Sequence, residues 1–301
     1  MISPLFAIHP TGAKRPMFLI APAGGVTFPY CRLLPYWDND RPLYTIQDPS
    51  LDPESPVVQT VEELARQYID IMKAQQPNGP YIIGGWSYGG VVSLDIARQL
   101  ALRGERAELV IFDTRIDGWG AKSPFARLGF ARKCVAVPKL IVAVFSHTGP
   151  YFRDGMYLIF IHGKRRGLLG RCVAAIIALL VGKAPFALLI EERPHLAGMV
   201  PPGLFRCLRV LKTNVTTVRG HRPKPVHAHG ALIKASDSAS LGLDDPDHDM
   251  GWGEMLLDGV DVYDTPGNHV TLMLSPAIDV VGSALREALV IADERLDTLH
   301  T

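Results

Sequence analysis

A serine between two glycines, at the end of an apolar run, is the feature of this sequence most able to do chemistry. Ser87 has Gly85 and Gly89 two residues away on either side, after the β-rich residues 81–84 and before a helix-like run, 91–97. A serine on a sharp strand-to-helix turn needs such small neighbours, and the turn lifts its hydroxyl clear of the sheet. The first N–H groups of the helix then point at developing negative charge. Ser87 is therefore a candidate nucleophile, and the alternative is an ordinary glycine-rich turn.

A serine hydroxyl needs a base to take its proton and a carboxylate to hold that base in the right tautomer. Of the ten histidines, His269 fits best, because it ends a short polar loop after the last predicted strand. This loop, residues 265–269, is too short and polar to place a histidine in the core. We therefore predict His269 as the base, and the alternative is a surface histidine.

Two aspartates are candidates for the carboxylate. Asp113 directly follows the predicted strand 107–112, and Asp237 follows the predicted strand 226–235. Both positions are used in the α/β-hydrolase architecture, where the three residues follow in the order Ser, Asp, His. We favour Asp113 because it lies right at its strand end, although it could also be a capping residue. Asp237 stays the alternative acid.

Acyl transfer passes through a tetrahedral oxyanion, which needs backbone donors aimed at it. Tyr88, the residue after the candidate nucleophile, would supply one N–H group. Ala23 is placed for the second, because it lies in residues 22–25, directly after the early strand 16–21, and two glycines there let the backbone approach a substrate. The alternative for this segment is a plain tight turn.

The elements that would position these residues alternate between strand and helix. Strands are predicted at residues 16–21, 42–47, 81–84, 107–112, 226–235 and 260–263, and helices at 60–76, after the elbow, and at 276–292. Such alternation indicates a mostly parallel sheet covered by helices on both faces.

The rhythm changes between residues 118 and 215, which we interpret as a helical lid inserted into a core formed by 1–117 and 216–301. Its apolar runs exceed what a short surface insertion needs, so part of it should line an acyl channel. Residues 118–200 carry twelve Lys or Arg and three Asp or Glu, whereas the whole chain has a formal net charge of +1. The densest basic cluster, Lys164, Arg165 and Arg166, could dock an acidic partner. The alternatives are a solvated lid edge or contact with an anionic membrane.

Four blocks of the sequence resemble the thioesterase domains of polyketide and non-ribosomal peptide synthetases: residues 18–25 with Tyr30 downstream, 85–90, 112–114 and 267–269. The resemblance extends over residues 8–115 and 226–290. It implies an α/β-hydrolase fold with a mostly parallel central sheet, helices on both faces and a helical lid insertion.

The same resemblance implies a substrate and partner. The substrate would be a polyketide, peptide or fatty acyl thioester on the 4′-phosphopantetheine of an acyl or peptidyl carrier protein or domain. An acyl-serine on Ser87 would then be released to water or to an internal nucleophile, with no cofactor in the protein itself. Two alternatives are a carboxylesterase or lipase of the same fold and a non-catalytic binding module on a hydrolase scaffold.

Composition and residue spacing argue against several other classes of protein. The near-neutral charge argues against a nucleic-acid binder, and the four cysteines are too widely spaced for a zinc site or disulfide framework. No secretory signal is seen at the N-terminus, so a cytoplasmic location is expected, and the apolar residues 171–190 are interrupted by Gly182, Lys183 and Pro185. His227 and His229 share one strand face but have no further metal ligand at suitable spacing, so no metal is expected.

Overall fold

A single seven-stranded sheet organises the part of the chain that the computed structural model describes, residues 4–52, 54–116, 192–199, 204–237 and 248–298. Its strand order is β1-β3-β2-β4-β5-β6-β7. Strand β1 pairs antiparallel with β3, and the other neighbouring pairs are parallel. The strands are β1 (Leu5–His9), β2 (Met17–Ile20), β3 (Leu43–Ile46), β4 (Tyr81–Trp86), β5 (Ala107–Phe112), β6 (Gly230–Ala235) and β7 (Val260–Thr265).

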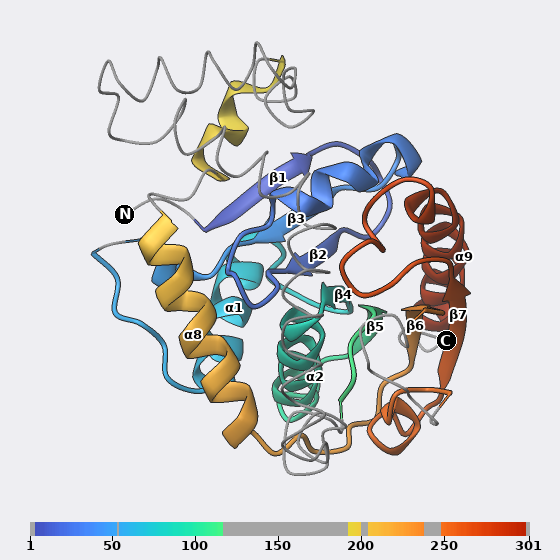
Figure 1. Cartoon of the computed structure of the whole chain (residues 1–301). Coiled ribbons are helices and arrows are strands. Elements are labelled where there is room, and N and C mark those ends of the chain that lie inside the picture. Colours follow the sequence, from blue (N-terminus) through green and yellow to red (C-terminus); the bar gives the residue numbers. More distant parts are fainter. Residues whose placement is uncertain (1–3, 53, 117–191, 200–203, 238–247, 299–301) are drawn as a thin grey trace, which may run out of the picture.

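Helices cover both faces of this sheet (Figure 1). The α-helices are α1 (Val61–Gln75), α2 (Tyr88–Ala101), α8 (Leu204–Gly220) and α9 (Ala277–Thr298), and the short 3-10 helices are η1 (Phe28–Tyr36), η2 (Pro49–Leu51), η3 (Pro194–Met199) and η5 (Trp252–Glu254). Helices α1, α2 and α8 lie together on one side, whereas α9 packs with η1 on the other. The prediction of a mostly parallel sheet between helical layers is confirmed.

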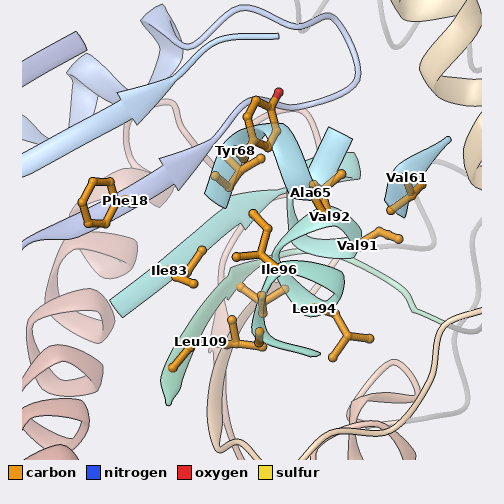
Figure 2. Close-up of a cluster of buried hydrophobic side chains, with 14 of the residues drawn as sticks. Phe18, Val61, Ala65, Tyr68, Ile83, Val91, Val92, Leu94, Ile96 and Leu109 are labelled. Carbon is orange, nitrogen blue, oxygen red and sulfur yellow. The ribbon is translucent and has the colours of Figure 1, made fainter. Parts of the chain in front are cut away.

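Two buried clusters correspond to these two sides. One includes Phe18, Tyr68 and Val92 and fills the space between the sheet and helices α1 and α2, as Figure 2 shows. The other includes Leu19 and Leu285 and lies under α9 and η1. Strands β2 to β5 are buried along their whole length, which explains why their sequences are apolar runs and do not alternate.

Helix α1 illustrates how local sequence sets an element. Thr60 is its N-cap, and the threonine hydroxyl accepts a hydrogen bond from the Glu63 N–H at 3.1 Å. Val61, Leu64 and Tyr68 then recur on the buried face. The predicted helix 60–76 therefore agrees with the structure to within one residue at each end.

Several predicted boundaries differ from the structure. Strand β6 begins at Gly230, because Val226 makes only an isolated bridge with Leu256. Helix α9 continues to Thr298, and the edge strand β1 was not predicted. Helix α8 runs without a break across the predicted lid boundary at 215/216. Most of the predicted lid, residues 118–191, lies outside the described residues.

Candidate active site

Ser87 lies at the turn between β4 and α2, with φ 59° and ψ −123°. This conformation is strained for an L-residue other than glycine, and such strain collects at functional sites. Gly85 and Gly89 are required because a side chain at either position would clash with neighbouring backbone atoms. A Cβ atom on Gly85 would lie 2.3 Å from the Gly89 carbonyl carbon, and one on Gly89 would lie 2.4 Å from the Ile20 oxygen. The predicted strand-to-helix elbow is therefore present.

Asp113 and His269 meet although they are far apart in the sequence. His269 Nδ1 donates a hydrogen bond to Asp113 Oδ2 at 2.7 Å, because an ionised carboxylate can only accept. The other carboxylate oxygen, Oδ1, accepts from the Ala235 N–H at 2.8 Å. Only 4% of the Asp113 side chain is exposed, against 32% of that of His269. The Asp113 carboxylate is buried and accepts two hydrogen bonds. It therefore fixes the tautomer of the His269 imidazole and leaves Nε2 able to take a proton.

Short contacts connect this pair to Ser87. The Ser87 N–H donates to the Phe112 carbonyl at 3.2 Å, and the Thr114 hydroxyl donates to the Ser87 carbonyl at 2.9 Å. Phe112 and Thr114 are the two neighbours of Asp113 in the chain. The Trp86 and His269 rings lie with their centroids 5.6 Å apart. The three candidate residues therefore lie at the carboxyl ends of strands of one sheet, Ser87 after β4, Asp113 after β5 and His269 after β7.

Asp237 takes a different position. It is exposed, and its backbone N–H donates to the Gly267 carbonyl at 2.9 Å, at the start of the loop that carries His269. Gly267 has φ +88°, and within the same loop the Asn268 amide oxygen accepts from the Thr271 N–H at 3.1 Å. Asp237 thus borders the histidine loop through its main chain, whereas Asp113 accepts the hydrogen bond from His269.

The segment proposed for the oxyanion hole lies directly beside the elbow. Strands β2 and β4 are paired with Ile20 opposite Gly85, so the loop that contains Ala23 follows β2 next to Ser87. Tyr88 is the first residue of α2, where backbone N–H groups have no partner within the helix. The backbone donors of Ala23 and Tyr88 are therefore carried by two adjacent strand ends.

The Tyr30 hydroxyl bridges the ends of β2 and β4 by two hydrogen bonds. It donates to the Ile20 carbonyl at 2.7 Å and accepts from the Trp86 N–H at 2.8 Å. Burial raises the pKa of the Tyr30 hydroxyl well above its usual value, so the group stays protonated and keeps its donor. The sequence pointed to Tyr30 only through the family resemblance, because its spacing carries no signal of this bridge.

Two further supports were missed. The Trp252 indole N–H donates to the Thr114 carbonyl at 2.6 Å, and the Ile116 N–H donates to the Met250 carbonyl at 3.1 Å. The segment around Met250 therefore holds the residues that follow Asp113. No recognisable motif surrounds Trp252, so the sequence gives no signal for this role.

His227 and His229 precede β6, which begins at Gly230, so the prediction that they share a strand face is wrong. Both have carboxylate partners. His229 lies between Glu108 at 3.1 Å and Asp261 at 3.3 Å, and His227 lies 3.1 Å from Asp258. In the described part of the chain no group of three or more His, Cys, Asp or Glu residues has the arrangement of a metal site.

Lys164, Arg165 and Arg166, the predicted docking cluster, lie outside the described residues. Among the residues that are described, no helix is both long and apolar enough to cross a membrane.

A mostly parallel sheet whose strand ends carry a nucleophile-type elbow defines the α/β-hydrolase fold, and solved structures agree. The NocB thioesterase domain from the nocardicin cluster matches with a TM-score of 0.60 at 20% identity, over 95% of this chain and 98% of that one. The four-domain nonribosomal peptide synthetase holo-AB3403 matches with a TM-score of 0.64 at 23% identity, over 95% of this chain and 20% of that one.

The comparison with protein families is more specific than the comparison of folds. Residues 15–117 match the family model described as Thioesterase domain, so the resemblance predicted from the sequence is confirmed. The matched segment contains Ala23, Ser87 and Asp113, and His269 comes from beyond it.

Sequence relatives match a limited part of the chain. An atromentin synthetase of Tapinella panuoides is 35% identical over 107 residues, which are 36% of this chain and 11% of that protein. An atromentin synthetase of Paxillus involutus that is named inactive is 33% identical over 105 residues. The matched region is about a tenth of the length of these relatives.

Proposed function

We propose that this protein is a serine thioesterase that releases a polyketide, peptide or fatty acyl chain from a phosphopantetheinyl carrier protein. The observation that carries the proposal is the 2.7 Å hydrogen bond between His269 and buried Asp113, beside the strained turn at Ser87. The match of residues 15–117 to the Thioesterase domain model supports a thioester as the substrate.

The reaction would take place in two steps. His269 Nε2 removes the Ser87 hydroxyl proton as Oγ attacks the thioester carbonyl, and the backbone N–H groups of Ala23 and Tyr88 stabilise the oxyanion. The carbon–sulfur bond then breaks, the pantetheine thiolate takes the proton from His269, and an acyl ester remains on Ser87. Water, or a hydroxyl or amine within the chain, repeats the attack and restores free Ser87.

The direct test compares Ser87→Ala with the wild-type protein on acyl-pantetheine thioesters, with intact-mass detection of the acyl-enzyme. Loss of the nucleophile should remove turnover and the acyl adduct while the thermal unfolding temperature stays close to that of wild type. Ser283→Ala is the matched control, because this exposed hydroxyl donates to the Asp279 carbonyl and accepts from Arg286, both within α9. Retained turnover in Ser87→Ala would refute the proposal.

Two other functions are separated by further measurements. A carboxylesterase or lipase would prefer aryl esters over thioesters of the same acid. A non-catalytic module would fail to react with a fluorophosphonate, and the relative named inactive makes this comparison necessary. A solved complex of the NocB thioesterase domain holds a fluorophosphonate covalently, which supports the choice of probe.

A further inference from the structure

Asn214 connects helix α8 to the loop that carries Ala23. Its side chain is buried, and Nδ2 donates to the Ala23 carbonyl at 3.1 Å and to Asp48 Oδ2 at 2.9 Å. An amide nitrogen has two hydrogens, so both bonds can form at once. One side chain from α8 therefore joins the loop after β2 to the segment after β3.

The partners of Asn214 are themselves held in place. The Asp48 N–H donates to the Gly25 carbonyl at 2.9 Å, and Asp48 Oδ1 accepts from the Ser50 N–H at 2.8 Å. The Gly25 N–H in turn donates to the Pro22 carbonyl at 2.8 Å. The Pro22 carbonyl and the Ala23 N–H belong to one planar peptide unit, so this turn sets the direction of the N–H. Asn214 holds the next peptide unit through the Ala23 carbonyl, and therefore limits the rotation of the backbone on both sides of the Ala23 Cα.

The next turn of α8 contacts the other proposed oxyanion residue. The Thr217 hydroxyl donates to the Asn214 carbonyl at 3.0 Å, which leaves its oxygen to accept from the Tyr88 hydroxyl at 3.3 Å. The Tyr88 ring is buried, and burial raises the pKa of its hydroxyl, so it remains a donor. One stretch of α8 therefore touches both Ala23 and Tyr88.

We propose that Asn214 is a positioning residue that aligns the Ala23 N–H with the oxyanion, and that α8 acts as the support for the oxyanion hole. This inference rests on the proposed function. Removal of a whole oxyanion-hole donor costs about 10²–10³-fold in kcat, and a misplacement of about 1 Å can cost about 10²-fold. A donor that is loosened but still present should lose less, about 10- to 100-fold.

The test uses Asn214→Asp, which keeps the shape of the side chain but removes both donors and places a carboxylate against Asp48. Asn214→Ala is a second variant without the added charge. We expect kcat for an acyl-pantetheine thioester to fall about 10- to 100-fold in each, with KM changed less than about 3-fold. Thr216→Ala is the control, because its exposed hydroxyl bonds to the Lys212 carbonyl on the same helix. It should keep wild-type kcat.

A second readout separates positioning from general loosening of the fold. Affinity for a boronic acid, which forms a tetrahedral adduct on Ser87, should fall in parallel with kcat/KM. Affinity for a non-hydrolysable thioether analogue of the substrate should stay the same. Equal losses for both ligands, or unchanged kcat in the folded variants, would overturn the role of Asn214 and leave the thioesterase proposal standing. A wild-type protein that neither turns over nor forms the adduct would refute the proposed function, and with it this inference.

Discussion

The carboxylate of Asp113 is held from two sides, and the Asp113→Asn exchange tests its role. An asparagine amide would offer an N–H to His269 Nδ1 and so favour the wrong tautomer of the imidazole. We expect kcat to fall about 10²–10⁴-fold with little change in the unfolding temperature. Asp237→Asn should change kcat less than about 3-fold, because Asp237 is exposed and His269 Nδ1 bonds to Asp113. The reverse pattern would assign the acid to Asp237.

The thiols of Cys31 and Cys207 test the burial of single residues. Burial raises the pKa of Cys31 to about 12 and that of Cys207 to about 11, because an apolar environment disfavours the thiolate. At about pH 8 both should react with iodoacetamide far more slowly in the folded protein than in concentrated urea. Peptide mapping by mass spectrometry would measure each site. Rapid alkylation of Cys31 in the folded protein would contradict its placement in the core.

Single residues with a local signature could be predicted from the sequence. Ser87 has its glycines within two positions, and Asp113 and His269 follow strand ends. Tyr30 and Asn214 could not be predicted as supports, because their partners lie far away in the chain, at Trp86 and at Ala23. Such contacts depend on the packing of strands and helices, which leaves no periodic pattern.

Tyr30 acts at the level of elements, since one hydroxyl joins the ends of β2 and β4. Tyr30→Phe would leave the buried Trp86 N–H without this acceptor, at a cost of about 1–3 kcal/mol in the free energy of unfolding. Tyr36→Phe is the matched control, because the Tyr36 hydroxyl bonds to Asp279 at the surface. It should cost less than about 1 kcal/mol. Urea unfolding measures both, and equal losses would show that the Tyr30 bridge has no special weight.

The extent of each element was harder to predict than its type. Strand β1 has only five residues and pairs along the sheet edge, so its pattern is too short to stand out. The predicted lid boundary at 215/216 followed a change in composition, whereas helix α8 continues through it to Gly220. The helix is continuous there because Asn214 and Val218 both turn inward toward the core region.

At the scale of the whole molecule, an ion pair connects the start of the chain to its last helix. Arg41 has a side chain only 2% exposed and pairs with Asp293 of α9, which also pairs with Arg15. Asp293→Asn would leave the buried guanidinium without its counter-charge, and we expect a loss of about 2–4 kcal/mol in unfolding free energy. Asp297→Asn removes a 70% exposed partner of Arg15 and should cost less than about 1 kcal/mol. Similar losses by calorimetry would contradict the argument from burial.

The backbone angles at Ser87, φ 59° and ψ −123°, are close to the mirror image of an ordinary extended residue. Glycine is achiral and adopts these angles without strain, so Ser87→Gly should relieve about 1–3 kcal/mol of backbone strain. The greater conformational entropy of glycine in the unfolded chain should offset about 0.5–1 kcal/mol of this gain. Calorimetry should therefore find the glycine variant more stable than Ser87→Ala, which keeps the strain. If so, this protein gives up part of its resistance to heat at the position that we propose as its nucleophile, and selection for stability alone would favour the loss of that serine.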